Sequence, residues 1–81
     1  MEYTTDLLEI LNNIDPSLLD YQEWCNVGMA LKYESYKASD WDYWSQRDSK
    51  RYHKNECYRK WESFTGSGVT GGTIVQYAKN Q

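Results

Sequence analysis

Apolar residues recur at helical spacing along almost the whole sequence, and this periodicity limits the possible folds more than any other feature. The first set follows the i, i+3, i+4, i+7 template of an amphipathic helix: Leu7, Ile10, Leu11 and Ile14. Thr5 is its expected N-cap, and Pro16 should end it because the residue before a proline is pushed away from the α-helical region.

A second helix should begin at Asp20, with Glu23 three residues later in a capping-box arrangement, and run to about Tyr36. Its apolar stripe is Tyr21, Trp24, Val27, Gly28 and Leu31. Because a glycine inside a helix costs up to ~1 kcal/mol, Gly28 should have a packing reason, such as the close approach of another helix.

Three shorter helices should follow. Ser39 with Asp42 marks the third, and Asn55 is the expected cap of the fourth, whose inward stripe is Cys57, Trp61 and Phe64. Residues 45–53 should form a loop, and the glycine-rich residues 66–73 precede a last short helix. The prediction is an all-α fold, a single domain over residues 1–81 built as a compact bundle of about five short helices.

A chain of 81 residues has little room for a core, so large side chains must supply much of it. Four Trp and eight Tyr, against one Phe, meet this need. We expect Trp24 and Trp61 to be core residues. The two cysteines, Cys25 and Cys57, have no CxxC spacing, and both are expected to be small core residues rather than zinc ligands or nucleophiles.

Charge is divided unevenly along the chain. Residues 1–46 carry nine acidic residues against Lys32 and Lys37, a balance of −7, whereas residues 47–60 carry six basic residues against Asp48 and Glu56, a balance of +4. Cations gathered in one segment are compatible with a polyanion ligand despite a net charge of −3. A solvated basic face that serves solubility explains the same pattern.

Aromatic rings alternate with the cations of this basic segment, a mixture that is typical of single-stranded nucleic-acid binding. The candidate residues are Arg47, Lys50, Arg51, Tyr52, Lys54, Tyr58, Arg59 and Lys60. The alternative is that Tyr52 and Tyr58 only cover the edge of the core. Ser67, Gly68 and Thr70 of the glycine-rich segment are candidates to hold one phosphate at the start of the last helix, the alternative being a helix C-cap and turn.

Other chemistry finds little support in the sequence. The glycine pattern follows a helix rather than a strand, and Gly72 stands where a phosphate-binding loop needs its lysine, so we expect no nucleotide hydrolysis. His53 is the single histidine, and no third group orients a Cys–His pair. We predict no catalytic residue, no metal, no cofactor and no small-molecule substrate. No apolar run is long enough to span a membrane, which favours a cytoplasmic protein.

Several ordered motifs resemble the second type of primase C-terminal domain. DYQEW at residues 20–24 and VGMAL at 27–31 look like its opening signature, and KWESF at 60–64 and GSGVTGGT at 66–73 look like its later landmarks. Trp44-Ser45, Tyr52, Glu56-Cys57 and Tyr77-Ala78 match between and after them. The resemblance covers residues 14–79 or so.

The resemblance implies a helical accessory module of replication proteins in phages, plasmids and mobile elements, beside a primase or helicase catalytic domain. Met1 looks like a native start, so we expect a chain that acts in trans on a polymerase or primase subunit and on single-stranded DNA. Its expected docking patch is aromatic: Tyr33, Tyr36, Trp41 and Tyr43. The alternative for these rings is that they complete the core. The alternative is an interaction module or inhibitor that does not bind DNA.

Overall fold

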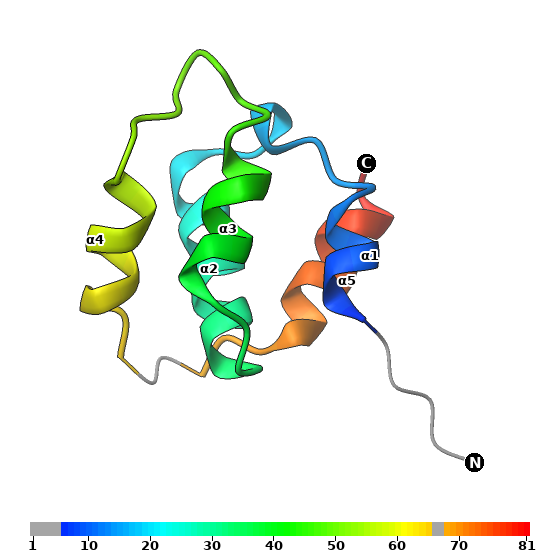
Figure 1. Ribbon diagram of the computed structural model, residues 1–81. Helices are drawn as coiled ribbons and strands as arrows, with labels where there is room; N and C mark the ends of the chain where they lie inside the picture. Colours follow the sequence, from blue (N-terminus) through cyan, green and yellow to red (C-terminus); the bar gives the residue numbers. More distant parts are fainter. Residues whose placement is uncertain (1–5, 66–67) are drawn as a thin grey trace.

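The computed structural model describes residues 6–65 and 68–81, and over these residues helices joined by turns and loops make up the chain, with no strand (Figure 1). The elements in chain order are α1 (Leu7–Leu11), the 3₁₀ turn η1 (Pro16–Leu18), α2 (Tyr21–Tyr33), α3 (Ala38–Ser45), α4 (Glu56–Ser63) and α5 (Gly71–Lys79). The prediction of an all-α bundle of five short helices is therefore confirmed.

Helix α2 is the central element of the bundle. It packs against α3 and α4 on one side and against α5 on the other, while α1 lies along α5 and α3 lies along α4. Figure 1 shows the α1–α5 pair and α4 at opposite ends of the molecule, with α2 and α3 between them. A loop over residues 46–55 connects α3 to α4 and runs past the start of α2.

Local hydrogen bonds between side chains and backbone N–H groups determine where the helices begin. Asp20 and Glu23 form the predicted capping box at α2, with bonds of 2.8 and 2.9 Å between each carboxylate and the other residue's backbone N–H. The cap of α1 is Asp6 rather than Thr5, because the Asp6 carboxylate accepts from Leu8 N–H. Thr5 lies outside the described residues.

Helix α2 ends at Tyr33, three residues before the predicted end. Ser35 adopts a left-handed conformation with φ of 69°, and the Tyr36 N–H then donates to the carbonyl of Leu31. This turn stops the helix and directs the chain back along α2 as α3.

The core is centred on Trp41 of α3, which is fully buried. Its ring stacks on Trp24 of α2 at a centroid distance of 4.5 Å and lies 5.3 Å from Phe64, just after α4. Gly28 makes this packing possible, because a Cβ there would lie 2.6 Å from a ring carbon of Trp41 and 2.8 Å from one of Phe64. The predicted packing reason for Gly28 is thus the approach of two rings to the α2 backbone.

We expect Gly28→Ala to lower the free energy of unfolding by about 1–3 kcal/mol, because the added methyl group displaces Trp41 and Phe64. This is the net loss, after the ~1 kcal/mol that alanine adds to helix propensity. Urea unfolding monitored by circular dichroism would measure the change.

Gly72→Ala in α5 is the matched control. Its Cβ would lie 3.5 Å from Thr70 Oγ1, an ordinary contact, so the substitution should leave stability unchanged or raise it slightly. Equal effects of the two substitutions would contradict the packing role of Gly28.

Candidate nucleic-acid interface

The loop over residues 46–55 is fastened to α3 by a buried carboxylate. Asp42 is only 7% exposed, and its two oxygens accept from the Tyr52 hydroxyl at 2.8 Å and from the Gln46 side-chain amide at 3.1 Å. Donation to this carboxylate, together with burial, raises the pKa of Tyr52. Tyr52 therefore positions the loop, and its hydroxyl is committed to Asp42.

Two of the predicted DNA-contacting arginines are held by other parts of the chain. Arg51 pairs with Asp48 at 2.5 Å and donates to the carbonyls of Pro16 and Leu19, which ties the loop to η1. Arg47 donates to the backbone and side-chain oxygens of Asn12 at the end of α1. Both arginines are exposed, but their guanidinium groups already satisfy internal acceptors, so they are less available to a ligand than the sequence suggests.

The remaining cations differ in their availability. The Lys60 ammonium lies 4.8 Å from the ring centroid of Tyr21 in a cation–π contact. Lys50, Lys54 and Arg59 are exposed, and no hydrogen bond or ion pair engages their side chains within residues 6–65 and 68–81. Tyr58 is 43% exposed, so its ring is accessible for stacking.

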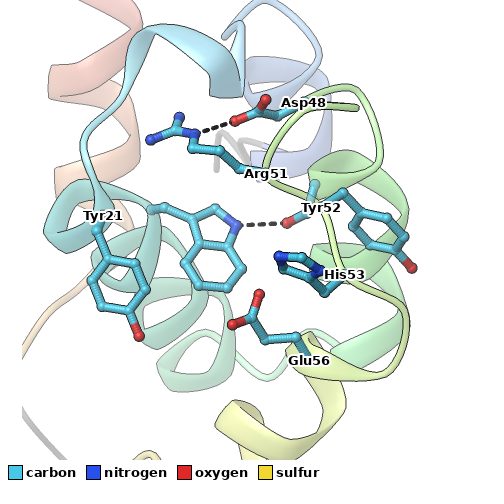
Figure 2. A pocket seen from close by; sticks show the side chains of 8 residues that line it. Tyr21, Asp48, Arg51, Tyr52, His53 and Glu56 are labelled. Atoms are coloured by element: carbon cyan, nitrogen blue, oxygen red, sulfur yellow. Dashed lines mark hydrogen bonds and ion pairs between the residues drawn. The ribbon is translucent and has the colours of Figure 1, made fainter.

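A pocket of about 220 Å³ opens between the start of α2 and the loop that precedes α4. Figure 2 shows Tyr21 on one side of this pocket and His53 and Glu56 on the other. The Trp24 indole also lines the pocket and donates to the Ser45 hydroxyl at 2.8 Å. The full lining is Tyr21, Trp24, Ser45, Asp48, Arg51, Tyr52, His53 and Glu56.

Sequence reasoning missed this pocket. It placed Tyr21 on the inward stripe of α2, but Tyr21 is the first residue of the helix and 56% of it is exposed. Its neighbours in the pocket, His53 and Glu56, come from a segment more than thirty positions away. The capping box was the available signal, because it makes Tyr21 a residue of the first turn, where a side chain can extend beyond the core.

At the start of α5, next to the predicted phosphate site, side chains already bond the first backbone amides. Glu34, the C-cap of α2, accepts from Gly71 N–H at 2.9 Å, and Thr70 accepts from Gly72 N–H through its side chain. These bonds pair the first amides of α5 and count against an anion site at Thr70. Gly68 is exposed with φ of 82°, and Ser67 lies outside the described residues.

The four residues of the expected docking patch differ in their exposure to solvent. Trp41 is fully buried, so its assignment to a docking surface is wrong: its ring fills the core above Gly28. Tyr36 is half-buried, and its hydroxyl accepts from Leu7 N–H at 3.0 Å. Tyr33 and Tyr43 remain, at 61% and 74% exposure.

Both thiols are buried, as expected for core cysteines. Burial raises the pKa of Cys25 and raises that of Cys57 to about 11. Residues 6–65 and 68–81 contain no group of three or more His, Cys, Asp or Glu side chains that could hold a metal ion.

Fold and site together define the class: a small helical domain in which a partly free basic segment borders an aromatic pocket. The sequence matches the family model described as Primase C terminal 2 (PriCT-2) over residues 7–78, and the chain therefore belongs to this family. The match begins at the first helix, earlier than the predicted start near residue 14, and the family associates the domain with primases.

Searches of curated proteins and of solved structures found no match to the chain. Among the helices that the structure describes, none combines the length and the apolar character needed to cross a membrane.

We expect both thiols to resist alkylation in the folded protein. Raising the pKa of Cys57 from 9.0 to about 11 lowers its thiolate fraction at pH 8 about a hundredfold, and the thiolate is the reactive form. Iodoacetamide labelling followed by mass spectrometry should be slow in buffer, faster as the pH rises, and complete in urea.

In the variants Cys25→Ala and Cys57→Ala, the labelling rate is that of the one remaining thiol. Labelling in buffer as fast as in urea would contradict the burial of that cysteine.

Proposed function

We propose that this PriCT-2 domain is a non-catalytic accessory module of a phage or mobile-element priming system. In this role it binds template single-stranded DNA weakly and docks on a primase or polymerase catalytic subunit. Membership of the PriCT-2 family supports the priming context. The observation that carries the DNA-binding part is the set of exposed, unengaged cations on residues 50–59, next to accessible aromatic rings.

The proposal assigns different roles to the six cations of the basic segment. Arg47 and Arg51 hold the loop in place, and Lys60 packs over the Tyr21 ring. Lys50, Lys54 and Arg59 are available to contact phosphates. Rings beside them supply stacking surfaces, which favours an unpaired strand whose bases are accessible. Three contacts in an otherwise acidic chain give weak binding, so attachment to a catalytic subunit would raise the effective DNA concentration.

The burial of the two cysteine thiols, the strongest candidate nucleophiles, supports the proposed lack of catalysis. Both thiols are buried, and the raised pKa of Cys57 keeps it protonated near neutral pH.

We expect affinity for a labelled single-stranded oligonucleotide to fall as salt rises, with a log–log slope of about −2 for three phosphate contacts. Lys50→Gln with Lys54→Gln should reduce this slope to about −0.7, since one contact remains. Fluorescence anisotropy at several salt concentrations measures both values.

The matched control is Lys37→Gln with Lys79→Gln, which has the same net charge but changes lysines outside the basic segment. It should keep the slope of the unmodified protein. A salt-independent affinity, or an equal loss in both double variants, would refute DNA binding by this segment.

For docking, we expect Tyr33→Ala with Tyr43→Ala to weaken binding to a primase or polymerase catalytic subunit at least tenfold, because exposed tyrosines are frequent interface hot spots. Leu18→Ala is the control, since Leu18 is also an exposed apolar residue, at 68% exposure, but lies in η1. Surface plasmon resonance with the purified catalytic subunit measures both, and equal affinities of the two variants would exclude these tyrosines.

A further inference from the structure

The pocket beside α2 has the size of a site for one flat group. Its volume of about 220 Å³ is below the roughly 300–1,000 Å³ of pockets that enclose drug-sized ligands. It opens at the surface between Tyr21 and the residues before α4, so a group attached to a longer chain can enter it (Figure 2).

One side of the pocket is aromatic. The rings of Tyr21 and Trp24 lie 5.7 Å apart and are tilted by 46°, and Tyr21 is 56% exposed. The Trp24 ring is held in place by its bond to Ser45 and by stacking on Trp41. A rigid ring beside an exposed ring provides a surface on which a planar heterocycle stacks.

The opposite side presents a hydrogen-bond acceptor. Glu56 is half-buried, and its carboxylate points into the pocket beside His53 (Figure 2). No hydrogen bond or ion pair engages this carboxylate within the part of the chain that the structure describes. An ionised carboxylate only accepts hydrogen bonds, so it selects a ligand with N–H donors.

Charge around the pocket favours a ligand on an anionic chain. Asp48 within the pocket is neutralised by Arg51. Lys60 lies over the Tyr21 ring, and Lys54 directly follows His53 in the sequence. These two cations can contact the phosphates on either side of a bound base.

We propose that this pocket binds a single unstacked base of single-stranded DNA, with a preference for guanine. Stacking against Tyr21 and Trp24 would hold the ring, and the Glu56 carboxylate would accept from the adjacent N1–H and N2–H of guanine. Thymine has one N–H between two carbonyl groups and fits a carboxylate poorly. The inference rests on the proposed DNA binding and adds base selectivity to it.

The test compares thymidine oligonucleotides of equal length, one of which carries a single central guanosine. We expect the guanosine oligonucleotide to bind about tenfold more tightly, the effect of a good bidentate pair. It should also shift the indole N–H resonance of Trp24 in nuclear magnetic resonance spectra. Glu56→Gln should remove the preference for guanine while salt-dependent binding of the thymidine oligonucleotide persists.

Glu62→Gln is the matched control, because it makes the same change of charge at an exposed position of α4 outside the pocket. It should keep the preference for guanine. Equal affinity of the unmodified protein for both oligonucleotides would overturn the base pocket and leave the proposed function standing, whereas binding of neither would overturn both. A Trp24 shift caused by an arginine-rich peptide but not by the guanosine oligonucleotide would assign the pocket to a protein partner.

Discussion

The contact of Trp41 with Gly28 is the constraint on which the rest of the fold depends. The Trp41 ring of α3 lies against the bare backbone of α2, stacks on Trp24 and contacts Trp61 of α4, so one side chain joins three helices. Its indole N–H has no hydrogen-bond partner among the residues that the structure describes, and ring packing therefore drives its burial. The same stack holds Trp24 in place, and Trp24 lines the pocket.

Two carboxylates near the protein interior explain why the basic segment is only partly free. Asp42 is bonded by Tyr52 and Gln46, and Asp48 is paired with Arg51. Removing any of these donors would leave a poorly solvated carboxylate, which is costly. The hydrogen bonds of Tyr52 and Arg51 thus hold the loop over residues 46–55 in place. This loop presents Lys50, Lys54 and the pocket residue His53 at the surface.

Much of the fold could be predicted from local patterns, and much of the candidate site could not. The capping box at Asp20, the apolar periodicities and the inward stripe of α4 are short-range features, which the structure confirms. The end of α2 was missed because a serine, rather than glycine, adopts the left-handed turn. Whether Arg51 or Lys50 is free depends on the carbonyls of Pro16 and Leu19, which lie more than thirty residues earlier in the chain.

The sequence by itself determined the helical class, the aromatic core, the concentration of positive charge in residues 47–60 and the PriCT-2 family. Each of these follows from the types of residue present and from their spacing over short stretches of the chain. Only the tertiary structure decided that Trp41 is internal, that Glu34 occupies the start of α5, and that Tyr21 faces Glu56 across a pocket. These outcomes depend on contacts between residues far apart in the chain, whose partners are set by how the helices pack rather than by any local pattern.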